Sequence, residues 1–194
     1  DEQVKAFVTP LYEKAAKTQK YKDCIVELRQ DRHSLGDAVI SPRAAFKGPE
    51  EMAGAQRQFS FNIVAKPCRL GDDRPVSNGQ AVEFLWFSGA DAVDPWNSFD
   101  AEIVVEIGES PDRMEKIVVD RPGVVAVPPG VWRGAVEVRR VGKPLCFIPW
   151  YQHDKARYRL TRQYIDGKPV LVYDDESTID SPTSGDELYM QIKR

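Results

Sequence analysis

The chain has 194 residues, of which 42% are hydrophobic and 29% are charged, the composition of an ordinary soluble globular domain. Its formal net charge is −3 and no large block carries one sign, which argues against a nucleic-acid partner. No apolar run approaches the ~18–20 residues that a bilayer-spanning helix needs, so no membrane partner is expected. The residues Asp1-Glu2-Gln3 at the start show no signal-peptide pattern.

The cysteines and histidines point to a reduced setting without a metal. Cys24, Cys68 and Cys146 are odd in number and widely separated, which argues against a disulfide framework and against a structural zinc site. We interpret all three as small apolar residues and expect a cytoplasmic location. The chain has only two histidines, His33 and His153, so the sequence predicts neither a metal nor another cofactor.

The N-terminal part predicts a helical and loop extension. Within residues 1–30, apolar or small side chains recur at helical spacing, at Val4, Phe7, Val8, Leu11, Tyr12 and Ala15. Pro10 would break or kink this helix. Residues 33–58 are rich in Gly and Pro and predict loops, with an edge strand near residues 38–40. We therefore expect residues 1–58 to pack as an extension on the rest of the chain.

Residues 59–150 predict a series of short strands. Phe59, Phe61 and Ile63 alternate with Ser60 and Asn62, which is the period of a half-buried strand. Turn signals rich in Gly, Pro, Asn and Asp separate the segments. Many short strands with regular turns predict an antiparallel sandwich or barrel. The other strand segments are residues 82–87, 101–107, 116–119, 124–127, 135–138 and 145–148.

The C-terminal part predicts one more hairpin. Asp166-Gly167 lies between residues 159–164 and 170–173, and Asp-Gly between two apolar runs is a strong hairpin signal. An acidic tail rich in Ser, Thr and Pro follows. We assign residues 151–194, hairpin and tail together, to the same domain as the preceding strands.

The most informative stretch is residues 123–133, an apolar run followed by a Pro-Pro-Gly turn and a second strand. It resembles the second conserved motif of the cupins, a Pro-x-Gly turn that places a metal-binding His on the next strand. Arg133 stands at that His position. Glu83, followed by an apolar strand and Gly89, resembles the end of the first cupin motif. The resemblance covers residues 59–150 and implies a mainly β fold, the antiparallel double-stranded β-helix or jelly-roll barrel.

The metal ligands of the cupins are not matched in this chain. The first two His positions of the motif fall on Val76 and Asn78, or on Ser77 and Gly79, depending on the gap. Of the four ligands that the resemblance implies, only Glu83 is present.

Arg133 cannot ligate a cation, because a guanidinium is permanently charged and presents only donors. At the metal position its charge would pair with Glu83, and two interpretations stay open. In the first, Arg133 binds a small anionic ligand bidentately, with Trp86, Trp132 and Asn78 lining the site. In the second, the pair only fills the former metal site.

Three functional hypotheses follow. The first is a metal-free cupin-like protein that binds a small ligand or has a structural role. The second is an isomerase- or lyase-type enzyme on a small polar substrate, with Glu83 as base, Arg133 as electrostatic stabiliser and His153 or a tyrosine as acid. The third is an oligomeric partner-binding protein. Because cupins commonly dimerise, the resemblance implies a homodimer.

Overall fold

The computed structural model describes residues 26–31, 36–46, 57–70, 74–77, 81–152 and 159–174 of the chain. Within these ranges the fold is mainly β, with thirteen strands and one short 3-10 helix, η2 (Gly36–Ala38). Most of the helix expected over residues 1–30 lies outside the described residues. Its expected end is wrong, because Arg29–Asp31 forms strand β1.

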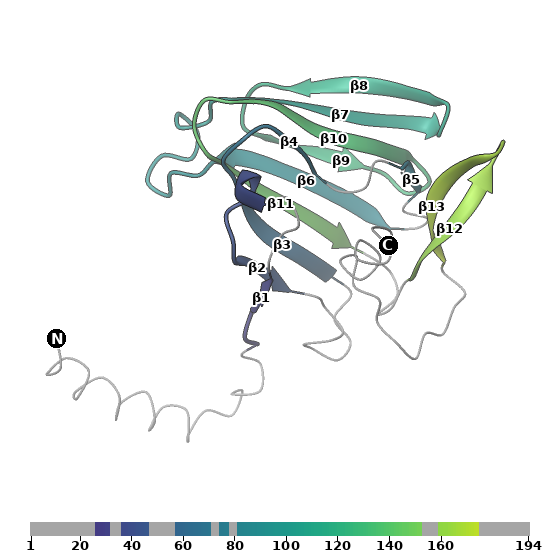
Figure 1. Cartoon of the computed structure of the whole chain (residues 1–194), viewed down its shortest axis with the longest axis horizontal. Helices are drawn as coiled ribbons and strands as arrows, with labels where there is room; N and C mark the ends of the chain where they lie inside the picture. Colours follow the sequence, from purple (N-terminus) through teal and green to yellow (C-terminus); the bar gives the residue numbers. More distant parts are fainter. Residues whose placement is uncertain are drawn as a thin grey trace, which may run out of the picture.

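Six antiparallel strands form sheet A, in the order β1-β2-β3-β11-β6-β9 (Figure 1). Strand β1 pairs with the outer edge of the short strand β2. Strand β2 lies where the sequence predicted loops. The bounds are β2 Arg43–Phe46, β3 Arg57–Val64, β11 Leu145–Gln152, β6 Val82–Gly89 and β9 Gly123–Val127.

Sheet B has seven strands, in the order β12-β13-β5-β10-β7-β8, with β4 also paired to β10. Its pairings are antiparallel except that β13 lies parallel to β5. The bounds are β4 Cys68–Leu70, β5 Val76–Ser77, β7 Ala101–Ser110, β8 Arg113–Val119, β10 Trp132–Val141, β12 Arg159–Ile165 and β13 Lys168–Asp174.

The strand order is that of a jelly roll. The central strands β3-β11-β6-β9 belong to sheet A and the strands β5-β10-β7-β8 to sheet B, so the chain crosses between sheets after β3, β5, β6, β8, β9 and β10. Only β7 and β8 are joined as a hairpin within this central set. Two four-stranded sheets with this order define the jelly-roll fold. The predicted fold class is confirmed by this order.

Two predicted turns are present with the expected backbone. Gly130 has a φ of 76°, and the N–H of Val131 donates to the carbonyl of Pro128 at 3.2 Å, as in a type II turn that needs Gly at its third position. Asp166 and Gly167 have φ values of 49° and 77°, the type I′ geometry that matches the twist of a hairpin. The Pro-Pro-Gly turn therefore delivers the chain directly into β10.

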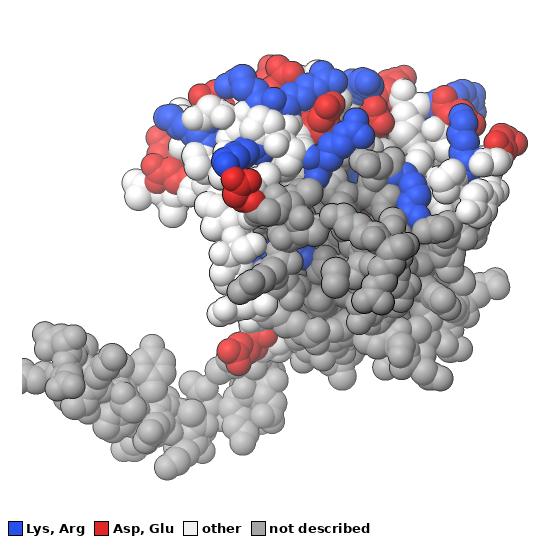
Figure 2. All heavy atoms as spheres, viewed as in Figure 1, with Lys and Arg blue, Asp and Glu red and all other residues white. Residues whose placement is uncertain are grey.

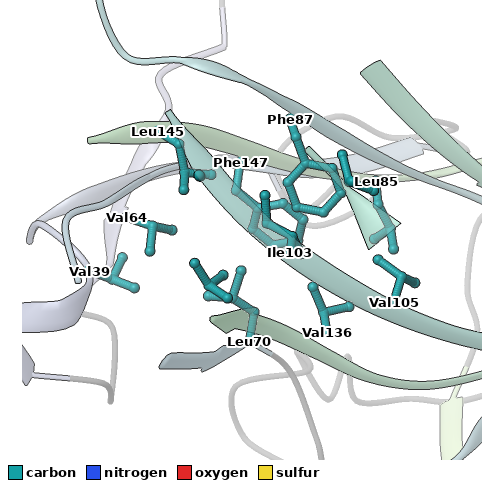
Figure 3. Close-up of a cluster of buried hydrophobic side chains, with 13 residues drawn as sticks. Val39, Val64, Leu70, Leu85, Phe87, Ile103, Val105, Val136, Leu145 and Phe147 are labelled. Carbon is teal, nitrogen blue, oxygen red and sulfur yellow. The ribbon is translucent and has the colours of Figure 1, made fainter. Parts of the chain in front are cut away.

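The hydrophobic core fills the space between the two sheets. Leu85 and Phe87 of β6 and Ile103 and Val105 of β7 belong to one buried cluster (Figure 3). The ring of Phe87 stacks on that of Phe147, with centroids 5.1 Å apart. Alternate residues of each strand enter this cluster, as expected for strands that are buried on one face.

Strand β3 departs from the usual orientation of an amphipathic strand. Its polar residues Ser60 and Asn62 are buried, whereas Phe61 is 44% exposed. Asn62 is satisfied inside, because its Nδ2 donates to the carbonyl of Phe147 at 3.0 Å and to Ser60 Oγ at 2.9 Å. The alternation predicted this strand correctly, but its aromatic side points away from the core.

We predict that Gly108→Ala destabilises the fold. A Cβ at Gly108 would collide with the backbone of Arg113 and Met114 in β8, which no side-chain rotation relieves. The expected loss is about 1–3 kcal/mol of unfolding free energy, measured by urea titration.

Gly123→Ala is the matched control. The nearest atom to a Cβ there is the carbonyl oxygen of Arg121, 4.0 Å away, so the added methyl group meets no clash. We expect a change between zero and a gain of about 1 kcal/mol. Equal losses for the two variants would contradict the described β7–β8 packing.

Candidate functional site

The centre of the candidate site is a buried ion pair between the two sheets. Glu83 lies on β6 of sheet A, and Arg133 lies at the start of β10 in sheet B, directly after the Pro-Pro-Gly turn. Arg133 Nε donates to Glu83 Oε2 at 2.7 Å, and their side chains are 7% and 0% exposed. Arg133 Nη1 also donates to the carbonyl oxygen of Gly134 at 2.8 Å. The pair therefore bridges the two sheets across the interior.

Local sequence explains why both side chains point inward. Glu83, Leu85 and Phe87 occupy alternate positions of β6 and are all buried, so the carboxylate continues the inward row of this strand. On β10, Arg133 lies in register with Ile107 of β7 and with Val76 of β5, and a bulge follows before Val136. The pair thus lies at the end of the apolar rows, where the interior becomes polar.

Tyr151 is a neighbour of the pair that the motif comparison did not single out. It lies in register with Glu83 across the β11–β6 pairing and is half-buried. Side chains of directly opposed residues have Cβ atoms about 4.5–5.5 Å apart, so the phenol belongs to the same end of the interior. Tyr151 lies an even number of residues from the buried Leu145 and Phe147, so it is on the same inward face of β11. This alternation is the sequence signal that could have pointed to Tyr151.

The structure does not bring all of the predicted site residues together. Trp86 is 44% exposed and lies three positions from Glu83, on the outer face of sheet A. Trp132 alternates with Arg133 and therefore faces away from the interior on sheet B. Neither tryptophan therefore lies on the inner face beside Arg133, and their role in lining a site stays a prediction. Asn78 and His153 lie outside the described residues.

The described residues at this position do not fit a divalent metal ion. Transition metals need several carboxylates, imidazoles or thiolates converging on one point. In the described part of the chain no group of three or more His, Cys, Asp or Glu residues has such an arrangement. Oε2 of Glu83 accepts a hydrogen bond from the guanidinium of Arg133, whose positive charge would repel a cation at this position.

The two cysteines that the structure describes lack activated thiols. Burial raises the pKa of the Cys68 thiol to about 11. Burial also raises the pKa of the Cys146 thiol, against a smaller lowering from its hydrogen bond with Ser88. A nucleophilic cysteine needs the opposite shift, so these residues act as apolar packing. Cys146 is buried as expected, whereas Cys68 is only partly buried. Cys24 lies outside the described residues.

No protein-family model and no curated protein matches the chain. Among solved structures, it aligns with a recombinant oxalate oxidase in complex with glycolate at 11% identity and a TM-score of 0.43, over 66% of this chain and 57% of that one. It also aligns with the capsular polysaccharide assembling protein CapF from Staphylococcus aureus at 14% identity and a TM-score of 0.45, over 86% of this chain and 37% of that one.

The class of the protein follows from its own strand order. Two facing sheets in jelly-roll order place the chain in the fold class that includes the cupins. The chain spans 57% of the length of the oxalate oxidase.

We predict that substitutions of Glu83 and Arg133 have strongly non-additive effects on the unfolding free energy. Arg133→Met leaves the Glu83 carboxylate buried without its cation. Glu83→Leu leaves the Arg133 guanidinium buried without its carboxylate. Each should lower the unfolding free energy by about 3–5 kcal/mol, whereas the double variant should recover most of that loss. Urea unfolding of the four proteins gives the coupling energy.

The matched control is the exposed pair on sheet B, Arg139 Nε to Glu137 Oε2 at 3.0 Å, with side chains 42% and 36% exposed. Arg139→Ala should change the unfolding free energy by less than about 1 kcal/mol. Additive losses at positions 83 and 133 would show that the two side chains do not interact in the core.

Proposed function

We propose that this chain is a metal-independent, cupin-like jelly-roll protein with a binding or structural role, in which the Glu83–Arg133 pair takes the place of a metal centre. The observation that supports it is the 2.7 Å bond between these two buried side chains. The pair stands where the cupin resemblance would place the ion. Arg133 supplies there a positive charge that belongs to the chain itself, in place of the charge of a bound ion.

The energetics of the site favour a permanent pair. Burying an unpaired carboxylate or guanidinium costs several kcal/mol, whereas a hydrogen-bonded pair compensates much of that penalty (about 3–5 kcal/mol is lost when one partner is removed). The further bond from Arg133 to the carbonyl oxygen of Gly134 satisfies another of its donors. Both charges are therefore neutralised within the fold.

The enzyme hypothesis has less support. A general base must come within hydrogen-bond reach of the proton that it removes, and the side chain of Glu83 has no exposed surface. Its carboxylate oxygen Oε2 already accepts the hydrogen bond of Arg133. The hypothesis took His153 or a tyrosine as its acid; His153 lies outside the described residues, and Tyr151 is the tyrosine in register with Glu83.

The metal-independent role predicts that chelation has no effect. Protein purified without chelator should contain well under one equivalent of Zn, Fe, Mn or Ni, and its thermal midpoint should be the same with and without EDTA. Elemental analysis and a calorimetric scan measure both quantities. A stoichiometric ion whose removal lowers the midpoint would refute the proposal, because ligand loss destabilises a protein that binds the ligand in its folded state.

A small anionic ligand at Arg133 is the second candidate. It is favoured by the difference in exposure within the pair, because the guanidinium side chain keeps 7% of its surface while the carboxylate keeps none. The cation is thus the member that an incoming anion would meet. A planar guanidinium binds carboxylates and phosphates through two parallel hydrogen bonds.

A thermal-shift screen of small carboxylates and inorganic phosphate tests this candidate. A ligand that binds Arg133 should raise the midpoint of the wild type, and Arg133→Lys, which keeps the charge but loses the planar fork, should bind about 10–150-fold more weakly. Arg139→Ala should respond like the wild type. Equal responses of Arg133→Lys and the wild type, or no response at all, would leave the pair with a structural role only.

A further inference from the structure

The Glu83–Arg133 pair is almost entirely buried, so any ligand of Arg133 needs a way in. The Glu83 side chain has no exposed surface and the Arg133 side chain keeps 7%. On the sheet B side, Val76 of the short strand β5 is in register with Arg133 and is itself buried. Opposed residues of paired antiparallel strands point to the same side of a sheet, so the Val76 side chain lies beside Arg133. A ligand reaches the guanidinium only if a neighbouring element moves.

Strand β5 is the neighbour of Arg133 that is attached most weakly. On one edge it pairs with β10 at Trp132 and Arg133, and on its other edge it pairs with β13 at Leu171 and Val172. Each edge thus has two residue pairs in the described part of the chain, whereas β10 and β7 pair along most of their length. The pairing with β13 is also parallel, which is the slightly less stable arrangement.

The β12–β13 hairpin lies on the outer edge of β5 (Figure 1). Val170 of β13 has no exposed surface, so the hairpin packs against the domain in the described structure. At its tip, Lys168 Nζ bonds to the carboxylate of Asp112 in the turn between β7 and β8. These two side chains are 66% and 41% exposed, and an exposed ion pair contributes little to stability. The hairpin is therefore attached by contacts that a local fluctuation can break.

We propose that the β12–β13 hairpin is a strap over this end of the interior, and that its release together with β5 opens the way to Arg133. A two-stranded hairpin has little stability of its own, so the strap stays closed only through its contacts with the domain. Local openings of such elements cost less free energy than global unfolding. The inference rests on the second candidate function, since only a ligand of Arg133 needs this access.

The strap would regulate anion binding by setting how often Arg133 is accessible. A ligand that binds only the open state has an apparent Kd equal to its intrinsic Kd divided by the open fraction. Variants that loosen the hairpin should therefore bind an anion more tightly, although they remove a contact of the folded chain.

Hydrogen exchange of the full chain without added anion tests the strap. In the wild type, the amides of β5 and β13 should exchange at least about tenfold faster than those of β7, because they are exposed by a local opening. Lys168→Asp places a like charge against Asp112 and should accelerate exchange of the β5 amides and of the Arg133 Nε–H about two- to fivefold. Gly167→Ala strains the hairpin turn, where φ is 77°, and should accelerate both about five- to thirtyfold.

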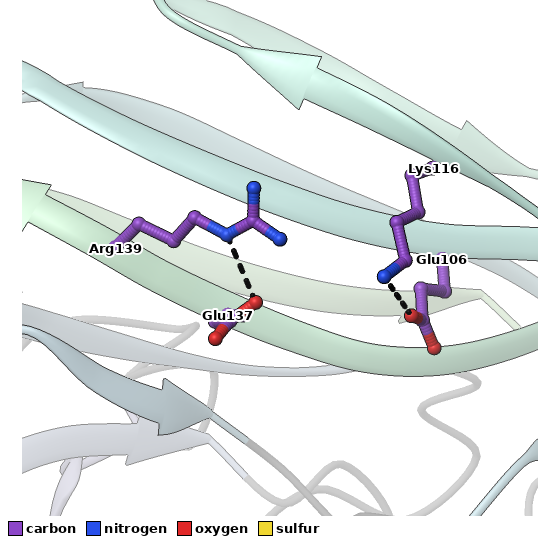
Figure 4. Close-up of polar contacts among 4 residues, drawn as sticks. All are labelled: Glu106, Lys116, Glu137 and Arg139. Atoms are coloured by element: carbon purple, nitrogen blue, oxygen red, sulfur yellow. Dashed lines mark hydrogen bonds and ion pairs between the residues drawn. The ribbon is translucent and has the colours of Figure 1, made fainter.

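The matched control is Lys116→Asp, on the outer face of sheet B. Lys116 Nζ lies 3.5 Å from Glu106 Oε1, and the Lys116 side chain is 62% exposed, much like that of Lys168 (Figure 4). Charged side chains of both signs gather over the strands of sheet B in the upper part of Figure 2, so one further reversal there is tolerated. This variant creates the same kind of repulsion away from the hairpin and should leave exchange at β5 and Arg133 unchanged.

A charge-swapped double variant completes the test. Asp112→Lys combined with Lys168→Asp restores an ion pair at the hairpin tip and should return both exchange rates to those of the wild type. Arg133 Nε–H exchange that stays constant while the β5 amides accelerate would overturn the proposal, since the strap would not cover Arg133. Amides of β5 that exchange only as fast as those of β7 would overturn it as well. A negative thermal-shift screen would refute the anion candidate instead, because these rates are measured without a ligand.

Discussion

The Glu83–Arg133 pair is the interaction that links the two sheets of this fold across the interior. One partner comes from β6 in sheet A and the other from β10 in sheet B, and their 2.7 Å bond joins the sheets where the apolar core ends. Hydrophobic contacts are tolerant of small shifts, whereas a buried charge pair has one favourable geometry. The pair therefore joins the two sheets at this end of the interior. The proposed metal-independent role rests on this join.

Much of this arrangement was predictable because its signals are local. Short apolar runs separated by Gly, Pro and Asp gave the strands, and the Pro-Pro-Gly sequence before Arg133 gave the turn that starts β10. Glu83 and Arg133 stand at ligand positions of the first and second cupin motifs, and this resemblance predicted their pairing. The short strands β2, β4 and β5 were missed because each has four residues or fewer, too few to show the alternation of apolar and polar residues that marks a strand.

The side toward which a strand faces was harder to predict, because it depends on partners distant in sequence. Phe61 and Trp86 read as core or cavity residues from their type alone, yet both lie on the outer face of sheet A. Asn62 faces inward because the carbonyl of Phe147 and the hydroxyl of Ser60 accept its hydrogens. These hydrogen bonds depend on the register between β3 and β11, which places Asn62 opposite Phe147. The sequence of β3 alone does not show that register. Sheet A therefore has a partly polar inner face and an aromatic outer one.

The most direct test of the central claim is the exchange rate of the Arg133 Nε–H proton with water, measured by nitrogen-15 NMR at mildly alkaline pH. A proton that is buried and bonded to Glu83 should exchange far more slowly than the Nε–H of Arg140, whose side chain is 57% exposed. The slow signal should shift or vanish in Glu83→Leu. An Arg133 Nε–H that exchanges as fast as that of Arg140 would contradict a buried pair at the centre of this fold.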